Sequence, residues 1–269
     1  MTSLLAETAI AAARAGGERL LARWRALPGG SISEKRQNDY VTLADRESEQ
    51  SIIAAIRERF PEDAFQAEEG GGKDLGAGSK RIWIIDPLDG TSNFIAGFPF
   101  WCVSIAAAEE GELAAGVVWD PLRGELYAAE RGAGAFRNGA RLAVTGREGV
   151  EGAFLATGFP FRSRDKIDVY LTLFRELFLK VRAIRRAGSA ALDLAMVAAG
   201  VFDGFFEFRL SAWDVAAGAL LIAEAGGELT DFAGGGRFLE RGNIVAGSHG
   251  VAAGIRACAA PILTEESLS

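Results

Sequence analysis

The sequence predicts a protein of mixed α and β structure that is built from two sheet-forming halves. Short apolar runs rich in β-branched and aromatic residues, bounded by turn residues, predict strands in both halves. Longer segments with apolar residues at helical spacing predict helices between these strands. The polar stretch 146–152 lacks strong periodicity, so we expect the halves to span about residues 1–148 and 149–269.

The first half is expected to open with helices and continue as a sheet. Asp45 falls in the first turn of the second helix, where the helix dipole favours an acid. Glu68 and Glu69 end a short strand, and Asn138–Gly139 is a typical hairpin turn. The expected elements are an amphipathic helix at 4–27, a polar connection at 31–38, a helix at about 44–60, a strand at 64–69 and an antiparallel meander between 100 and 136.

The second half is expected to alternate strands and helices. The helix around 211–225 is apolar over most of its circumference, so it should be buried, with Gly226 after its end. Asp214 in its first turn is favoured by the helix dipole, but its burial requires a metal ion or several N–H donors. The remaining expected elements are strands at 153–158, 181–188, 203–208, 226–232 and 243–248, and helices at 166–181, 191–201 and from about 251.

The most informative stretch is Arg81–Phe94, which reads RIWIIDPLDGTSNF. Its apolar run predicts a strand buried on both faces that stops at Pro87, because proline has no N–H for the ladder. Asp86 and Asp89 then flank a tight turn, and Gly90 and the residues after it predict a helix start whose free N–H groups suit phosphate.

Two carboxylates held close together repel each other, and a divalent cation removes that cost. Oxygen ligands suit a hard ion such as Mg²⁺. The alternative reading is structural, with Asp86 as a strand-end cap and Asp89 as a turn former. The strand before this pair and the GTSN sequence after it favour the metal interpretation.

Composition excludes several classes of function. The chain has 269 residues, of which 49% are hydrophobic and 24% charged, and a net charge of −7, which argues against a broad nucleic-acid surface. Two cysteines, Cys102 and Cys258, offer neither a disulfide framework nor zinc spacing, so we expect buried thiols. We expect no signal peptide, no membrane span and a cytoplasmic protein. His249 is the only histidine and should lie in an exposed loop, which disfavours histidine-dependent nucleophilic catalysis.

Several spaced motifs resemble the inositol monophosphatase family of magnesium-dependent, lithium-sensitive phosphatases, and most of all its bacterial branch. The resemblance covers nearly the whole chain. It implies a layered α/β sandwich of the inositol monophosphatase and fructose-1,6-bisphosphatase type, with a homodimer as the usual assembly. The matching segments are DYVTLAD at 39–45, AEEG at 67–70, DPLDGTSNF at 86–94, GAFRNGARLAV at 134–144, ATGFPFR at 156–162, RRAGSAALDLA at 185–195, DGFFE at 203–207 and WDVAAGALLIAEAGG at 213–227.

The resemblance implies a site for two or three Mg²⁺ ions and hydrolysis of a phosphate monoester by direct attack of water. The implied metal ligands are Glu68, Asp86, the Leu88 carbonyl, Asp89 and Asp214. Glu68, Thr91 and Asp45 would act on the attacking water, and Lys35 is a weaker candidate near the metals. The substrate would contact Asp89, Gly90, Thr91, Ser189, Ala190, Glu207 and Asp214, with Glu207 hydrogen-bonding sugar hydroxyls.

Within the family, the substrate is expected to be an inositol phosphate, because Glu207 and the SAWD sequence at 211–214 resemble the inositol enzymes. Fructose 1,6-bisphosphate, 3'-phosphoadenosine phosphate and histidinol phosphate are alternative substrates for the same chemistry. A regulatory protein associated with transcription is the alternative from another class, although the sequence shows no RNA-binding stripe. The expected partners are a small phosphate ester and a second copy of the chain, without nucleic acid or membrane.

Overall fold

The computed structural model describes residues 3–26, 32–36, 39–70, 79–161 and 163–264. Its helices are α1 (Leu4–Arg23), α2 (Leu43–Arg57), α3 (Thr91–Ala96), the 3-10 turn η1 (Arg164–Lys166), α4 (Ile167–Phe178), α5 (Ala190–Ala198), α6 (Ala212–Glu224), α7 (Phe238–Arg241) and α8 (His249–Ala259). Its strands are β1 (Ile32–Arg36), β2 (Asp39–Thr42), β3 (Ala64–Ala67), β4 (Arg81–Asp89), β5 (Cys102–Glu109), β6 (Glu112–Asp120), β7 (Glu125–Glu130), β8 (Gly134–Arg137), β9 (Ala140–Arg141), β10 (Phe154–Thr157), β11 (Ala183–Arg185), β12 (Gly204–Glu207), β13 (Glu228–Thr230) and β14 (Ile244–Gly247).

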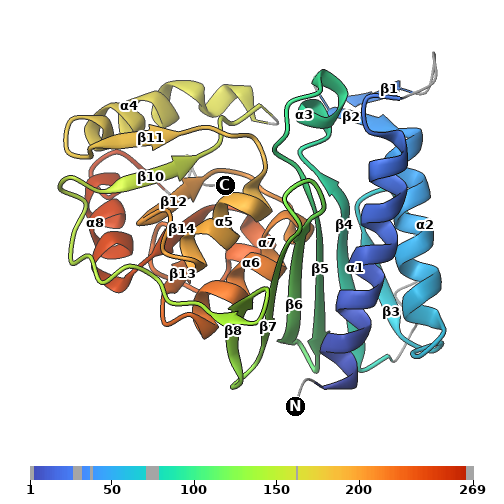
Figure 1. Ribbon diagram of the computed structural model, residues 1–269. Coiled ribbons are helices and arrows are strands. Elements are labelled where there is room, and N and C mark those ends of the chain that lie inside the picture. Colours follow the sequence, from blue (N-terminus) through green and yellow to red (C-terminus); the bar gives the residue numbers. More distant parts are fainter. Residues whose placement is uncertain (1–2, 27–31, 37–38, 71–78, 162, 265–269) are drawn as a thin grey trace.

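Helices and sheets alternate in five layers (Figure 1). Among the described residues, one large sheet has seven strands in the order β3-β4-β5-β6-β7-β8-β9, and a second has five in the order β11-β10-β12-β14-β13. Strands β1 and β2 form a separate two-stranded sheet. Helices α1 and α2 cover the outer face of the seven-stranded sheet, α5 and α6 lie between the two sheets, and α4 and α8 cover the outer face of the five-stranded sheet. This architecture confirms the layered α/β sandwich.

Strand β4 is buried on both faces, as its apolar run predicts. Trp83 and Ile85 pack into the core under α1 and α2, while Ile84 packs into the core shared with α5 and α6. These side chains alternate because successive residues of a strand point to opposite faces. The strand therefore joins the two cores and brings its C-terminal end to the junction between the layers.

Helix α6 is the central element between the sheets, and residues 214–222 are all buried. Gly116 and Gly218 allow this close packing, because a Cβ atom at Gly116 would lie 3.0 Å from the Ala217 carbonyl oxygen and one at Gly218 would lie 2.5 Å from Leu194 Cβ. The buried helix predicted from the apolar pattern is confirmed. Its burial fixes Asp214, in its first turn, against the seven-stranded sheet.

The structure corrects four expectations. Strand β4 continues past Pro87 to Asp89, because the missing N–H falls at a register break between Asp86 and Asp89. The expected polar connection contains β1, which pairs with β2. Helix α1 ends at Arg23, and His249 opens α8 instead of lying in a loop, because the Ser248 side chain caps that helix.

The meander and the hairpin are confirmed. Strands β5 to β8 pair antiparallel in sequence order, and Asn138 and Gly139 take positive φ angles between β8 and β9. Both cysteines are free thiols; Cys102 is buried and Cys258 is partly exposed. In the described ranges, no helix combines the length and the apolar character that crossing a membrane requires.

Candidate active site

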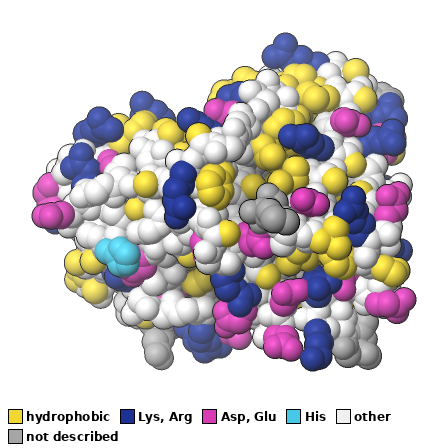
Figure 2. Space-filling model, turned by 60° about the horizontal axis from the view of Figure 1, so that its bottom comes forward, with side chains coloured by type: hydrophobic (Ala, Val, Ile, Leu, Met, Phe, Trp, Pro, Cys, Tyr) yellow, Lys and Arg dark blue, Asp and Glu magenta, His cyan; other side chains and the backbone are white. Residues whose placement is uncertain are grey.

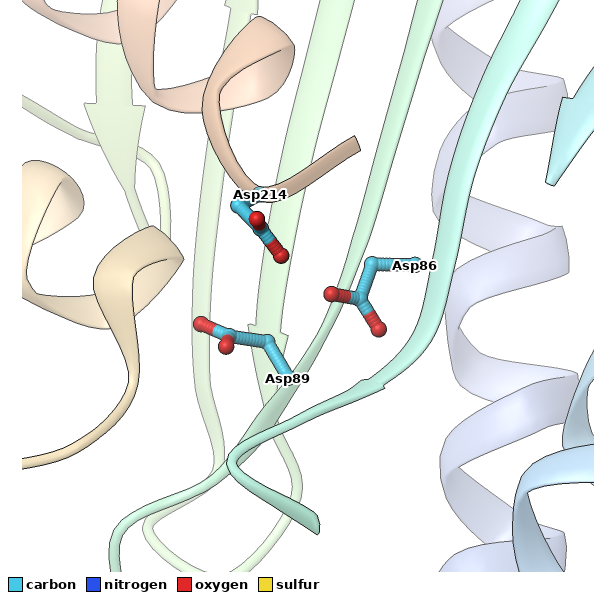
Figure 3. A group of neighbouring side chains, drawn as sticks. All are labelled: Asp86, Asp89 and Asp214. Atoms are coloured by element: carbon cyan, nitrogen blue, oxygen red, sulfur yellow. The ribbon is translucent and has the colours of Figure 1, made fainter. Parts of the chain in front are cut away.

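Three carboxylates converge where β4, α3 and α6 meet. Asp86, Asp89 and Asp214 each offer an oxygen, and these oxygens all lie within 4.8 Å of one another. Figure 3 shows the three side chains pointing toward a common centre, two from the end of β4 and one from the start of α6. In a regular strand, residues three apart point to opposite faces, so the register break within β4 is what brings Asp86 and Asp89 together.

Hydrogen-bond donors hold each of these carboxylates in place. The Leu88 N–H donates to Asp86 Oδ1 at 3.0 Å, and the Ser211 N–H donates to Asp214 Oδ2 at 2.7 Å as part of a capping box. Asp89 Oδ2 accepts from the Ser189 hydroxyl at 2.6 Å and from the Ala191 N–H at 2.7 Å. These bonds tie Asp89 to the start of α5, 100 residues along the chain.

The cluster is electrostatically costly without a cation. Burial raises the pKa of Asp86 well above its ordinary value, and the charges of Glu68, Asp89 and Asp214 raise it further. Carboxylate oxygens are the donors that hard divalent cations prefer, and such a cation would offset the repulsion among the acids. The donor set therefore fits Mg²⁺.

Thr91 stands beside the cluster with Asp45 behind it. The Thr91 hydroxyl lies 3.2 Å from Asp45 Oδ1 and 3.1 Å from the Leu88 carbonyl oxygen. Asp45 is fully buried, and its other oxygen accepts from the Thr42 N–H at 2.9 Å and the Thr42 hydroxyl at 2.5 Å. Burial raises the pKa of Asp45, whereas its hydrogen bonds lower it. The contact between Asp45 and Thr91 that the family resemblance implies is thus present.

Gly90 shapes the turn that leads into α3. Its φ angle is +96°, and a Cβ atom there would lie 2.9 Å from the Phe100 carbonyl oxygen. Only glycine adopts this conformation at low cost in so confined a place. Gly90 itself is the N-cap, and no side chain makes a capping hydrogen bond to α3. The first N–H groups of α3 are left without a capping side chain.

A pocket of about 170 Å³ extends from the cluster between the two sheets. Its volume suits a small ligand. All of the implied metal and substrate residues line it: Glu68, Asp86, Leu88, Asp89, Gly90, Thr91, Ser189, Ala190, Glu207 and Asp214. Asp45 is not among the lining residues and contacts Thr91 from outside the pocket. The side chain of Lys35 lies outside the described part of the chain.

Glu68 and Ser189 sit differently from the three clustered acids. Glu68 follows β3 on the pocket wall but does not belong to the group whose oxygens lie within 4.8 Å. Ser189 caps α5 and donates its hydroxyl hydrogen to Asp89, so it supports the cluster. Glu207 ends β12, and its carboxylate occupies the space beside Gly158, where a Cβ atom would lie 2.0 Å from the nearest carboxylate oxygen.

Sequence reasoning missed several residues of the pocket. Arg186 lines the pocket, and its guanidinium carbon lies 5.0 Å from the centre of the Phe161 ring. Asn93 joins α3 to the loop before α5, since its side-chain amide lies 2.9 Å from the Ala187 carbonyl oxygen. Asp193 is buried in the pocket wall, and its spacing of four residues from Ser189 in a helix was the signal for it.

Known proteins are similar to this chain in sequence. A match to the inositol monophosphatase family covers residues 1–265. The chain is 52% identical over 243 residues to "Nus factor SuhB" of Pseudomonas aeruginosa, covering 89% of this chain and 90% of that protein. It is 44% identical over 246 residues to "Inositol-1-monophosphatase" of Mesorhizobium japonicum, covering 91% and 92%.

Solved structures agree with these matches. The extragenic suppressor protein suhB from Bartonella henselae superposes with a TM-score of 0.90 at 39% identity, covering 96% of this chain and 98% of that one. The Thermotoga maritima IMPase superposes with a TM-score of 0.86 at 33% identity, covering 98% of each chain. This chain therefore belongs to the inositol monophosphatase family.

Proposed function

We propose that this protein is a magnesium-dependent phosphatase that hydrolyses the phosphate monoester of a polyol, with myo-inositol 1-phosphate as its substrate. The observation that carries the proposal is the buried cluster of Asp86, Asp89 and Asp214 beside the uncapped start of α3. Metal-binding carboxylates next to exposed N–H groups suit a phosphate dianion. The family match and the relative from Mesorhizobium japonicum support the same assignment.

The metal ligands in this proposal are Glu68, Asp86, the Leu88 carbonyl, Asp89 and Asp214, which would hold two or three Mg²⁺ ions. When bound, Mg²⁺ neutralises the charge of the phosphate and makes water more acidic. The hydrogen bonds from Leu88 and Ser211 keep the Asp86 and Asp214 carboxylates in position before any ion arrives. Such preorganisation reduces the cost of assembling the site.

Thr91 and Asp45 orient the attacking water. The Thr91 hydroxyl donates to Asp45, which leaves its oxygen free to accept a hydrogen bond from water in line with the phosphate. The N–H groups of Gly90 and Thr91 donate to phosphate oxygens at the start of α3. The attack is direct, and no phosphoenzyme forms.

Glu207 accepts a hydrogen bond from the alcohol part of the substrate, at the end of the pocket away from Asp86. Ser189 and Ala190 also line the pocket and would contact the substrate. The same chemistry on fructose 1,6-bisphosphate, 3'-phosphoadenosine 5'-phosphate or histidinol phosphate is the alternative within the family.

The test is phosphate release from myo-inositol 1-phosphate beside these three esters, with Mg²⁺ and with EDTA. We expect Mg²⁺-dependent turnover with the highest kcat/KM for the inositol ester, and inhibition by lithium. Higher kcat/KM for another ester would correct the substrate and keep the mechanism. A folded protein that turns over none of the esters would overturn the proposal.

A second candidate function is association with the transcription machinery, which the relative named "Nus factor SuhB" favours. Exposed apolar side chains on α4, at Ile167, Leu171 and Phe178, offer a surface for a protein partner, either a second copy of the chain or another protein. On the face shown in Figure 2, acidic and basic side chains are interspersed among the described residues without a continuous basic stripe.

The second candidate predicts a protein contact in the cytoplasm rather than nucleic-acid binding. Sedimentation of the purified protein tests the homodimer, and co-purification with RNA polymerase subunits tests the transcription role. Retention of that co-purification by an Asp89→Asn variant would separate it from phosphatase activity.

A further inference from the structure

The pocket contains a second pair of acids, Glu207 and Asp193, which are not among the proposed metal ligands. Glu207 ends β12, and Asp193 lies one turn into α5 from Ser189, so the two acids reach the same pocket from different elements. The Asp193 side chain is 1% exposed. Arg186 and Arg209 also line the pocket.

Asp120 is also buried, and its Oδ2 atom lacks a hydrogen bond but pairs with Arg123 Nε at 2.9 Å. Asp193 differs both from Asp120 and from the buried aspartates Asp203 and Asp231. Its Oδ1 atom is buried and no donor among the described residues reaches it. Asp203 Oδ2, in contrast, accepts from the Phe154 N–H at 2.7 Å, and Asp231 Oδ1 accepts from the Gly235 N–H at 2.7 Å. A buried carboxyl oxygen without a partner is destabilising, so its retention in a pocket wall points to a ligand that supplies the missing hydrogen bond.

We propose that Asp193 is a specificity-determining residue that hydrogen-bonds a hydroxyl of the alcohol part of the substrate, beside Glu207. This inference rests on the proposed phosphatase function and adds a residue to it. Two acids from separate elements contact two hydroxyls of a polyol and reject an ester whose alcohol has none. The group that Asp193 and Glu207 recognise is a vicinal diol, which an inositol ring and a sugar both contain.

The surroundings of Asp193 favour a hydroxyl over a cation as its ligand. Burial raises the pKa of Asp193 well above its ordinary value, the charges of Glu207 and Asp89 raise it further, and Arg186 opposes them. A neutral carboxyl group both donates and accepts a hydrogen bond, and a hydroxyl does the same. An ammonium group would instead need a charged carboxylate.

The test compares myo-inositol 1-phosphate with cyclohexyl phosphate, which has the same ring without the hydroxyls. In Asp193→Leu we expect kcat/KM for the inositol ester to fall about thirtyfold while kcat/KM for cyclohexyl phosphate stays within about threefold. Asp193→Asn should keep most of the activity on the inositol ester, because an amide both donates and accepts. Fructose 1,6-bisphosphate as a third ester distinguishes a sugar diol from the inositol ring.

Product inhibition gives a readout that a purely structural role would not move. We expect the inhibition constant of myo-inositol to rise about tenfold in Asp193→Leu and that of inorganic phosphate to stay unchanged. If Asp193→Leu does not fold, Asp193→Ala replaces it in both experiments. Asp231→Asn is the control for loss of a buried aspartate outside the pocket.

Equal losses on both esters, or no loss on either, would overturn the role of Asp193. Absence of turnover in the wild-type protein with every ester would instead refute the phosphatase function on which this role rests.

Discussion

Two groups of acids line the pocket and are built in different ways. Asp86, Asp89 and Asp214 form the proposed metal end, and Glu207 and Asp193 form the proposed alcohol end. At the metal end, Asp86 and Asp89 lie on one strand, and the N–H groups that hold Asp86 and Asp214 come from residues two or three positions away. At the alcohol end, Glu207, Asp193 and Gly158 come from three separate segments. Local hydrogen bonds therefore hold Asp86 and Asp214, while Asp89 depends on Ser189 and Ala191 at the start of α5. The alcohol end depends throughout on how the five-stranded sheet packs against α5.

The strongest test of the metal end is Asp89→Asn. Loss of one carboxylate charge should lower kcat about a thousandfold and weaken Mg²⁺ binding measured by calorimetry, because the ion loses a charged ligand. The asparagine oxygen can still accept from Ser189 and Ala191, so Tm should change little. Asp231→Asn is the matched control. Near-normal turnover in Asp89→Asn would contradict the assignment of this end to metal binding.

Thr91 tests the metal end without removing a charge. Thr91→Val keeps the shape of the side chain but loses the hydroxyl next to Asp45, so we expect kcat to fall about a hundredfold with little change in KM. Thr91→Ser restores the hydroxyl and should recover most of kcat. If valine and serine behave alike in steady-state kinetics, the hydroxyl does not position the water.

Gly158→Ala tests the alcohol end. A Cβ atom would lie 2.0 Å from the Glu207 carboxylate, so Glu207 must move. We expect KM for myo-inositol 1-phosphate to rise about tenfold while KM for cyclohexyl phosphate and the Mg²⁺ affinity stay near wild type. An equal rise in KM for both esters would show that the two ends of the pocket are not independent.

The smallest expected effect is on stability. Burial and neighbouring charges raise the pKa of Asp86, so without metal the folded protein binds this proton more tightly than the unfolded chain does. This contribution to stability is therefore lost as the pH rises from about 4 through the raised pKa and is regained on acidification.

The measurement is Tm at pH 5.5 and at pH 8 in EDTA. From pH 5.5 to pH 8, the Tm of the wild-type protein should fall by on the order of 3 °C more than the Tm of Asp86→Asn. Added Mg²⁺ should reduce this difference between the two proteins. If Tm depends on pH in the same way in the two proteins, the pKa of Asp86 is not raised.

Much of the fold followed from local patterns. Strand β4 was predictable because its apolar residues form one short continuous run. Helix α6 was predictable because apolar residues cover most of its circumference. The continuation of β4 past Pro87 was not predictable, because the register break that tolerates proline depends on pairing with β5. The pairing of β1 with β2 was missed because polar strands carry little periodic signal.

For the site, the sequence by itself pointed to Asp86 and Asp89 as a candidate metal site, because the two acids and Thr91 fall within six consecutive residues. Glu68 and Asp214 were added by the family resemblance. Only the tertiary structure decided that Ser189 holds Asp89, that Glu207 fills the space beside Gly158 and that Asp193 faces the pocket. These contacts join residues far apart in the chain, 49 positions for Gly158 and Glu207 and 100 positions for Asp89 and Ser189. Their proximity results from the packing of α5 between the two sheets, which no local pattern in the chain encodes.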